Sequence, residues 1–447
     1  MNHKHSRKIL MANVPADGHF NPLTGIAVHL KQQGYDVRWY GSDVYSKKAA
    51  KLGIPYFPFS KALEVNSENA EEVFPERKRI NSKIGKLNFD LQNFFVRRAP
   101  EYYADLIDIH REFPFDLLIA DCMFTAIPFV KELMQIPVLS IGIAPLLESS
   151  RDLAPYGLGL HPARSWAGKF RQAGLRWVAD NILFRKSINV MYDLFEEYNI
   201  PHNGENFFDM GVRKASLFLQ SGTPGFEYNR SDLSEHIRFI GALLPYAGER
   251  KEEPWFDSRL NKFDRVILVT QGTVERDVTK IIVPVLKAFR DSNYLVVATT
   301  GGNGTKLLRE QYKADNIIIE DFIPFTDIMP YTDVYVTNGG YGGVMLGIEN
   351  QLPLVVAGVH EGKNEINARI GYFRLGIDLR NERPTPEQMR NAIEKVIANG
   401  EYRRNVQALA REFKTYAPLE LTERFVTELL LSRRHKLVPV NDDALIY

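Results

Sequence analysis

Short apolar runs recur along the chain and alternate with stretches of helical periodicity. The first run, residues 9–14, does not alternate with polar residues, which predicts a strand buried on both faces. Two further runs, at 35–40 and 54–57, predict strands, and helical periodicity at 23–33 and 44–52 places a helix between each pair. This order of strand, helix, strand, helix and strand predicts the start of a doubly wound α/β domain.

The same alternation continues through the first half of the chain and starts again in the second half. In the first half, further strands are predicted at 116–120, 138–141, 216–219 and 237–241. In the second half, strands are predicted at 266–270, 295–299, 316–319, 333–337 and 354–357, and helices at 279–290, 385–399, 402–414 and 419–432. Two doubly wound units without a sequence repeat predict two facing α/β domains with a cleft at the carboxyl ends of their strands.

A charged stretch with two prolines, residues 245–262, divides the two units, and we predict that it is the interdomain linker. The first domain then covers residues 1–244 and the second covers residues 263–415. Within the first domain, residues 149–180 contain glycine, proline and tryptophan without clear periodicity. We therefore expect an irregular insertion over the cleft there.

Composition adds limits to this picture. The 447 residues carry a formal net charge of +1 with basic and acidic residues interspersed, which gives no electrostatic footprint for an anionic membrane or for nucleic acid, and we expect no nucleic acid as a partner. The one cysteine, Cys122, excludes an internal disulfide framework and suits a reducing compartment. No apolar run approaches the ~18 residues of a membrane span, and the apolar part of the basic N-terminus is too short for a signal peptide. We therefore expect a cytoplasmic protein.

A cluster of glycines follows the strand predicted at 333–337. The four are Gly339, Gly340, Gly342 and Gly343, and an apolar helix is predicted to begin near Val344. Glycines allow the backbone to approach a ligand, and the free N–H groups at a helix start suit an anion such as a diphosphate. The spacing matches neither a dinucleotide fingerprint nor a Walker loop. A glycine-rich turn without a ligand is the alternative.

The flanks of this turn carry a resemblance to a known family. Phe322-Ile323-Pro324-Phe325 precedes the glycines, and Lys363-Asn364 follows them. In this order and spacing they resemble the donor-binding signature of the nucleotide-sugar-dependent glycosyltransferases, and the resemblance covers nearly the whole chain. It implies a GT-B architecture, with the acceptor in the N-terminal domain and the nucleotide sugar in the C-terminal domain. It also implies that a C-terminal helix within 416–447 packs back toward the N-terminal domain and is followed by a loose tail.

His19 is the candidate catalytic base. It lies in the predicted loop directly after the first strand, at the edge where an α/β sheet places its ligand site. A satisfied surface histidine would fit the same position, but Gly18-His19-x-x-Pro22 resembles the family's catalytic-base loop. An imidazole, with an ordinary pKa of about 6.5, accepts a proton from an acceptor hydroxyl at neutral pH.

Asp121 occupies the place of the family's second catalytic residue, at the end of the strand predicted at 116–120. A carboxylate on the distal ring nitrogen would fix the tautomer of His19 and stabilise the imidazolium that forms. Asp116 is the competing assignment, although it opens that strand instead of ending it. The implied reaction is a direct displacement with inversion, in which the acceptor attacks the anomeric carbon and the nucleoside diphosphate leaves.

The departing diphosphate requires preorganised hydrogen-bond donors. The resemblance assigns this role to Gly272 and Thr273 after the first strand of the second domain, to the Asn338 side chain, and to the backbone between Gly340 and Val344. No Asp-x-Asp motif occurs in the chain. We therefore expect no metal and no cofactor, with the nucleoside diphosphate sugar as co-substrate.

Several donor-site positions depart from the family pattern. Asn338 stands where many relatives have a histidine, and asparagine donates a hydrogen bond without carrying charge. Phe322, followed by Ile323, replaces the tryptophan that stacks on the base in the plant enzymes. Glu349 is expected to replace a glutamate that binds the ribose. Lys363-Asn364 replaces the Asp-Gln pair that contacts the sugar, or belongs to a solvated charged loop.

An apolar acceptor is indicated by the frequent aromatic residues at 71–111 and by the apolar residues at 145–159, which include Tyr156. We predict that Phe89, Phe94 and Phe124 contact it, and core packing of these rings is the alternative. The predicted function is transfer of a hexose from a UDP- or TDP-sugar to a hydroxyl of a small apolar acceptor. A non-catalytic nucleotide-sugar-binding or partner-activating protein is the alternative, and a sugar-nucleotide epimerase or hydrolase is a third interpretation.

Overall fold

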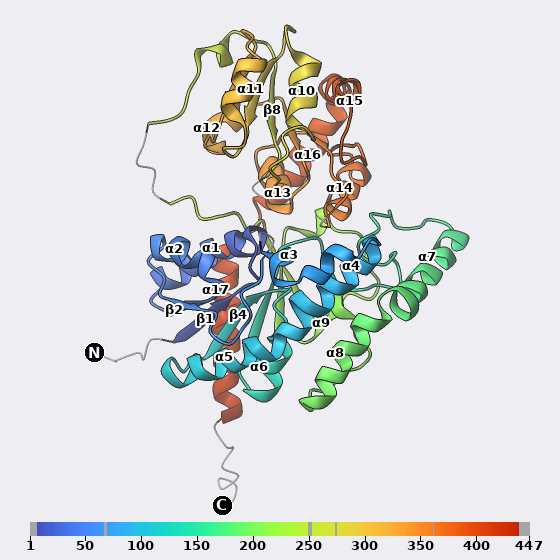
Figure 1. Cartoon of the computed structure of the whole chain (residues 1–447). Coiled ribbons are helices and arrows are strands. Elements are labelled where there is room, and N and C mark those ends of the chain that lie inside the picture. The colour runs from blue at the N-terminus through green and yellow to red at the C-terminus, as the bar shows by residue number, and fades with distance from the viewer. Residues whose placement is uncertain (1–6, 67–68, 249–252, 273–274, 361, 438–447) are drawn as a thin grey trace, which may run out of the picture.

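Two α/β units, each built on one parallel sheet, lie one above the other (Figure 1). All strand pairs in both sheets are parallel, which confirms the predicted fold class. We call the unit with the seven-stranded sheet the first domain and the unit with the six-stranded sheet the second domain. The computed structural model describes residues 7–66, 69–248, 253–272, 275–360 and 362–437.

The strands of each sheet follow a doubly wound order. The first sheet has the order β3-β2-β1-β4-β5-β6-β7, and the second has the order β10-β9-β8-β11-β12-β13. The strands of the first sheet are β1 (Lys8–Ala12), β2 (Asp36–Gly41), β3 (Tyr56–Pro58), β4 (Leu117–Asp121), β5 (Val138–Gly142), β6 (Leu217–Ser221) and β7 (Ile237–Gly241). Those of the second are β8 (Val266–Thr270), β9 (Leu295–Thr299), β10 (Ile317–Glu320), β11 (Val334–Thr337), β12 (Leu354–Val356) and β13 (Gly376–Asp378).

Helices cover both faces of each sheet. Those in the first half of the chain are α1 (Asp17–Gln32), α2 (Ser46–Lys51), α3 (Ala70–Val73), α4 (Lys83–Asp90), α5 (Ala99–Glu112), α6 (Ile127–Leu133), α7 (Trp166–Val178), the π-helical turn η5 (Ala179–Leu183), α8 (Arg185–Glu197) and α9 (Phe207–Arg213). Those in the second half are α10 (Ile282–Phe289), α11 (Thr305–Gln311), α12 (Phe325–Ile328), α13 (Tyr341–Glu349), α14 (Lys363–Tyr372), α15 (Pro386–Ala398), α16 (Gly400–Phe413) and α17 (Pro418–Leu437).

The central strand β1 explains the absence of alternation at its position in the sequence. Ile9 and Met11 belong to a core shared with α1 and α17, whereas Leu10 and Ala12 belong to a second core shared with α5 and α6. Successive strand residues point to opposite faces, and here both faces are covered. Each position of the strand is therefore apolar.

The last helix, α17, returns to the first domain and runs beside α1 in Figure 1. Its residues Phe425 and Val426 belong to the same buried cluster as the apolar face of α1. At the edge of this contact, His29 Nε2 lies 2.9 Å from Glu423 Oε2. The end of the chain thus contributes to the core of the first domain.

Helix α1 begins earlier than predicted, and this moves the candidate base. The helix starts at Asp17, so His19 lies in its first turn and not in a loop. Helical periodicity was recognised only from residue 23 onward. Pro22 removes only the hydrogen bond to the Gly18 carbonyl, and the helix continues through it.

Helix α13 also begins earlier than predicted, at Tyr341 instead of Val344. Gly342 and Gly343 therefore lie in its first turn. Glycine costs a helix only about 1 kcal/mol relative to alanine. Val344 and Ile348 are buried in a core of the second domain, and this burial offsets that cost.

Several regular elements were not predicted, among them α6, α7, α9, α11, α14 and β13. Residues 149–180 include α7, whose N-cap Ser165 accepts a hydrogen bond from the Gly168 N–H at 3.2 Å. Helix α14 was missed because its residues 365–370 are all buried, so it shows no polar face that would reveal its period. Strand β13 was missed because its sequence, Gly-Ile-Asp, holds one large apolar residue and therefore forms no apolar run.

Candidate active site

His19 and Asp121 meet at the carboxyl edge of the first sheet. His19 lies in the first turn of α1, which follows β1, and Asp121 is the last residue of the neighbouring strand β4. His19 Nδ1 lies 2.8 Å from Asp121 Oδ1. The two residues that the sequence singles out as base and partner are therefore in hydrogen-bond contact.

The Asp121 carboxylate is held by backbone groups as well as by His19. Its Oδ2 accepts a hydrogen bond from the Val14 N–H, and its Oδ1 accepts one from the Met123 N–H, both at 2.8 Å. Asp121 is fully buried, whereas 24% of the His19 side chain is exposed. When an ionised carboxylate is the acceptor, Nδ1 carries the imidazole proton and Nε2 is left free to act as a base.

Two nearby groups do not compete with this pair. Asp116 lies at the opposite end of β4, where its Oδ2 accepts a hydrogen bond from the Lys8 N–H at 3.0 Å. Cys122 directly follows Asp121 but is buried, and burial raises the pKa of its thiol to about 12. A thiol with that pKa stays protonated at neutral pH and is a poor nucleophile.

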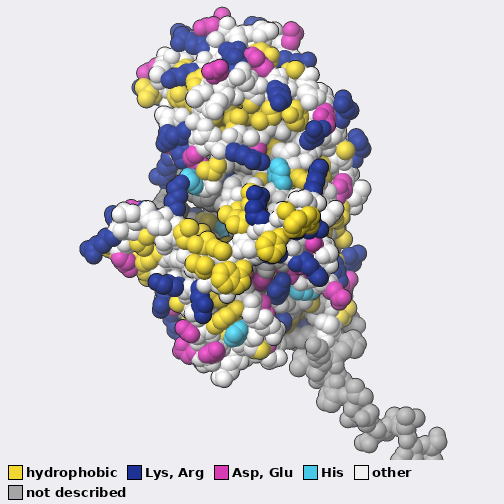
Figure 2. Space-filling view, turned by 90° about the vertical axis from the view of Figure 1, so that its right-hand side faces the viewer, with side chains coloured by type: hydrophobic (Ala, Val, Ile, Leu, Met, Phe, Trp, Pro, Cys, Tyr) yellow, Lys and Arg dark blue, Asp and Glu magenta, His cyan; other side chains and the backbone are white. Residues whose placement is uncertain are grey.

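The second domain faces this pair with the glycine turn after β11. Helix α13 follows the turn and contacts α1. The Tyr341 hydroxyl donates to the Ser221 carbonyl, at the end of β6, at 2.6 Å. The carboxyl edges of the two sheets therefore meet, and Figure 2 shows the surface hollowed beside this junction.

One position of the turn requires glycine. Gly339 has a φ of +84°, and a Cβ there would lie 1.8 Å from Asn367 Oδ1. Asn367 is fully buried in α14, and its Nδ2 donates to the Gly358 carbonyl at 3.0 Å. Asn367 therefore contacts both the glycine turn after β11 and the loop after β12. It was not predicted as a site residue, and its only signal is its place five residues after the Gly362 that precedes α14.

Asn338 ties two loops of the second domain together. Its Nδ2 donates to the Gln271 carbonyl in the loop after β8, and its Oδ1 accepts from the Gly340 N–H at 3.3 Å. Gly272, with a φ of +81°, lies beside this amide. A side-chain amide carries two N–H donors, so this structural role is compatible with the predicted contact to a diphosphate. Thr273 lies outside the described residues.

The other predicted donor residues differ in accessibility. Phe322 follows β10 and is 75% exposed, so its ring is open to stacking. Ile323 and Val344 are buried in a core of the second domain, where their side chains pack beneath the glycine turn's helix instead of facing a ligand. Glu349 is the last residue of α13 and is exposed.

Lys363 and Asn364 form the first turn of α14, which is anchored to the first domain. Asn364 Nδ2 donates to the Gly157 carbonyl. Further along the helix, the buried Arg369 Nη2 lies 2.8 Å from Glu227 Oε2 of the first domain. Breaking a buried ion pair leaves an uncompensated charge, so this contact fixes the position of α14 against the first domain.

The phenylalanines predicted to contact an acceptor do not share one pocket. Phe124 is fully buried, and its ring stacks on Tyr102 of α5 with centroids 5.0 Å apart. The prediction for Phe124 is therefore corrected, because this ring fills the core between β4 and α5. Phe89 and Phe94 pack on Phe74 in a half-buried aromatic cluster.

An apolar pocket lies between residues 146–160, the start of α8 and the start of α9. Its apolar lining includes Leu91, Leu147, Tyr156, Phe184, Ile188 and Phe207. The segment 145–159, from which an apolar acceptor was predicted, supplies part of this lining. The lining residues that η5, α8 and α9 contribute were not predicted, because these segments come together only in the folded chain.

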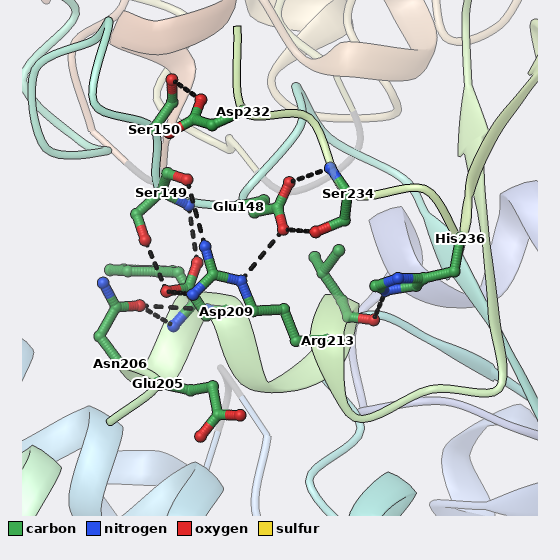
Figure 3. A network of polar contacts seen from close by, with 12 residues as sticks. Glu148, Ser149, Ser150, Glu205, Asn206, Asp209, Arg213, Asp232, Ser234 and His236 are labelled. Carbon is green, nitrogen blue, oxygen red and sulfur yellow. Dashed lines mark hydrogen bonds and ion pairs between the residues drawn. The ribbon is translucent and has the colours of Figure 1, made fainter. Parts of the chain in front are cut away.

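Polar contacts hold one wall of this pocket (Figure 3). Ser149 donates from its N–H to Asp209 Oδ1 at 2.6 Å and from its hydroxyl to Oδ2 at 2.5 Å. Arg213 lies 3.0 Å from Glu148 Oε1 and 3.2 Å from Asp209 Oδ2. Burial raises the pKa of Asp209, and the hydrogen bonds from Ser149 oppose that rise. This network fixes residues 148–150 against α9.

Comparison with known proteins finds relatives over nearly the whole chain. The chain is 31% identical over 406 residues to 4'-demethylrebeccamycin synthase of Lentzea aerocolonigenes, which covers 91% of this chain and 95% of that protein. It is 29% identical over 443 residues to UDP-glucosyltransferase 1 of Beauveria bassiana, which covers 93% and 94% respectively. The chain belongs to the nucleotide-sugar-dependent glycosyltransferases. A family model described as the C-terminal domain of erythromycin biosynthesis protein CIII-like proteins matches residues 291–427 of this glycosyltransferase.

A solved structure gives the same fold. The glycosyltransferase superposes on the crystal structure of CalG4, the calicheamicin glycosyltransferase, with a TM-score of 0.72 and 18% identity, over 95% of this chain and 98% of that one. The architecture is therefore GT-B. Among the described residues, no helix is both long and apolar enough to cross a bilayer. Within the same residues no three His, Cys, Asp or Glu side chains are placed to share a metal ion, and a metal-free reaction stays a prediction.

Proposed function

We propose that this glycosyltransferase transfers a hexose from a UDP- or TDP-sugar to a hydroxyl of a small apolar acceptor, by direct displacement with inversion. The observation that carries the proposal is the contact between His19 Nδ1 and Asp121 Oδ1 at 2.8 Å. A histidine oriented by a fully buried carboxylate has the geometry of a general base. A module that only binds nucleotide sugars has no need of such a pair.

The proposed step moves one proton and one glycosyl group. His19 Nε2 takes the proton of the acceptor hydroxyl while the oxygen attacks the anomeric carbon. The bond from this carbon to the diphosphate oxygen breaks at the same time, and its electron pair leaves with the nucleoside diphosphate. Asp121 stabilises the imidazolium that results.

The start of α13 is the proposed site for the diphosphate. Its first turn contains no acidic residue, and its free N–H groups and positive dipole end favour an anion. The Asn338 amide and the Lys363 ammonium are further donors at the two neighbouring loops. The exposed ring of Phe322 is the proposed stacking surface for the base.

The pocket between residues 146–160 and the starts of α8 and α9 is the proposed acceptor site. Its lining is mainly apolar, with a few polar groups such as Glu148, Asp180 and Asn206 at its walls. This combination suits a small apolar molecule with hydroxyl groups. Leu91 lines this pocket, whereas the nearby Phe89 and Phe94 do not. A contact of these two rings with an acceptor stays a prediction.

The test is release of nucleoside diphosphate by the purified protein. A panel of UDP-, TDP- and GDP-sugars is offered with pooled phenols, sterols and macrolactones, and His19→Ala is assayed beside the wild type. We expect release that requires both an acceptor and His19. Release of free sugar without an acceptor would indicate a hydrolase, and tight donor binding without release across the panel would favour a non-catalytic protein.

A further inference from the structure

Helix α7 presents aromatic side chains to solvent on one face. Trp166, Phe170 and Trp177 are 83%, 78% and 60% exposed. They occupy positions i, i+4 and i+11, which share one face of an α-helix. Gln172 and Ala179 are buried on the opposite face. Such large exposed aromatic residues on a single face mark a binding surface.

The exposed apolar surface extends beyond α7. Ile182 in η5 is exposed, and so are Ile84 and Leu87 on α4. Asn88 Nδ2 donates to the Leu183 carbonyl at 2.7 Å, so α4 lies directly beside η5. We call the exposed side chains of α4 and of residues 164–186, which include α7 and η5, the docking face. Figure 2 shows hydrophobic side chains gathered across the first domain with basic side chains among them.

The docking face is strongly basic, although the whole chain carries a net charge of only +1. Residues 164–186 contain one acidic residue, Asp180, and the following basic residues: Arg164, Lys169, Arg171, Arg176, Arg185 and Lys186. On α4, Lys83 and Lys86 flank the two exposed apolar residues. Of these basic residues, all except Arg176 form neither an ion pair nor a side-chain hydrogen bond with any described residue. Their charges are therefore available to a partner.

We propose that the docking face binds a membrane surface that carries anionic lipid headgroups. Aromatic residues on one helix face with Lys and Arg beside them are typical of helices that lie in the plane of the membrane interface. The rings enter the boundary between headgroups and acyl chains, and the cations neutralise the headgroups. Lysine, of which this surface carries four at positions 83, 86, 169 and 186, is instead depleted at protein–protein interfaces.

The docking face and the apolar pocket share a wall. Arg176, Asp180 and Phe184 line the pocket, while Trp177 and Ile182 between them face outward. An apolar acceptor dissolved in the membrane would therefore meet the protein on the side where the pocket lies. This consequence rests on the proposed function, whereas binding to the membrane surface does not.

The test is co-sedimentation of the full chain with lipid vesicles. Vesicles of phosphatidylcholine with about 30% phosphatidylglycerol are compared with pure phosphatidylcholine, at low and at high salt. We expect binding to the anionic vesicles that is at least about tenfold stronger than to the neutral ones and that weakens with salt. The combined variant Trp166→Ser, Phe170→Ser and Trp177→Ser should lower this binding by at least about tenfold.

Matched variants in the second domain are the controls. Leu307→Ser removes a side chain that is 65% exposed, and Lys306→Glu with Lys313→Glu reverses two exposed charges. These should bind vesicles as the wild type does, whereas Lys169→Glu with Arg171→Glu should bind more weakly. The proposal would be overturned if binding fell equally in the docking-face variants and in the second-domain controls. It would also be overturned if the wild type bound neither the anionic nor the neutral vesicles. A change in oligomeric mass of the triple variant, without vesicles, would assign the face to a second copy and also overturn it.

Tryptophan emission gives a second readout that does not depend on a disruptive variant. Trp166 and Trp177 lie on the docking face, whereas Trp39 is fully buried. The emission of Trp166 and Trp177 should shift to the blue when anionic vesicles are added to the wild type. Trp166→Phe with Trp177→Phe should keep binding and lose the shift, and a shift that persists in this variant would contradict the proposed contact.

Discussion

The first domain brings a titratable pair of side chains to the proposed site, whereas the second domain brings mainly the backbone of the glycine turn, with the Asn338, Lys363 and Phe322 side chains beside it. On the first side, backbone N–H groups of Val14 and Met123 hold the Asp121 carboxylate, which in turn contacts His19. In the second domain, side chains hold the backbone instead: the Asn338 and Asn367 amides contact the glycine turn. Proton transfer requires a titratable group, whereas a diphosphate is bound well by N–H dipoles that every peptide unit carries.

We therefore expect substitutions in the two domains to have different effects. A substitution on the first side should remove chemistry and leave donor binding intact. A substitution on the second side should disturb the turn, so that stability and donor affinity fall together. The following substitutions compare the two sides, from the largest expected effect to the smallest.

The largest effect is expected for His19→Ala. Turnover should fall by about 10²–10⁴-fold because the general base is lost. The affinity for nucleoside diphosphate, measured by calorimetry, should change by less than about twofold, because the base acts on the acceptor. His29→Ala, in the same helix, is the control and should keep wild-type turnover. Equal turnover in the two variants would remove His19 from the mechanism.

Asp121→Asn should lower turnover by about 10²-fold or more, because an amide no longer fixes the tautomer with Nε2 as base. Donor affinity should again be unchanged. Asp116→Asn, at the other end of the same strand, is the matched control and should keep wild-type turnover. A loss in the Asp116 variant and none in the Asp121 variant would reverse the assignment.

Gly339→Ala should lower the free energy of unfolding by about 2–3 kcal/mol, because its φ is positive and its Cβ would overlap the Asn367 amide. Gly342→Ala, three residues on, has no atom within 4 Å of the new Cβ and should be at least as stable as the wild type. Urea unfolding of both variants checks this. Equal stability would show that the turn does not depend on Asn367.

Asn338→Ala should weaken nucleoside diphosphate binding by about 1–3 kcal/mol, the usual cost of a lost charge-assisted hydrogen bond. Part of this loss is expected to come from the turn itself, because Asn338 also joins Gln271 to Gly340. Titration calorimetry measures the affinity. An unchanged affinity would remove Asn338 from the donor site.

The smallest effect is expected for metal removal. Addition of EDTA should leave turnover unchanged, because the diphosphate is held by N–H groups in this account. Turnover is measured before and after dialysis against the chelator. A loss that a divalent cation restores would contradict the metal-free reaction.

The sequence predicted the parts of the fold that rest on local pattern. The run at 9–14 identified β1 because a strand with two covered faces has no polar positions, and Asp121 was placed at the end of β4 for the same reason. His19 was misplaced into a loop because helical periodicity was recognised only from residue 23 onward. Its contact with Asp121 was nevertheless expected, because the two residues occupy the places of the catalytic pair in the family that the sequence resembles.

Features that depend on contacts between distant segments were not predicted. Asn367 supports Gly339 from another helix, and nothing in the local pattern indicates this. Residues 365–370 of α14 are all buried, so the sequence shows no helical periodicity there. The ring of Phe124 packs in the core instead of facing a ligand. The basic docking face was invisible in a net charge of +1, because charges elsewhere in the chain cancel it.

The anomeric configuration of the transferred sugar tests the central claim most directly. A donor with an α-linked sugar is converted to product, and the configuration is read from the proton coupling constant of the anomeric position by NMR. Direct displacement assisted by His19 and Asp121 predicts a β-linked product. An α-linked product would require a route other than a single displacement and would contradict the account.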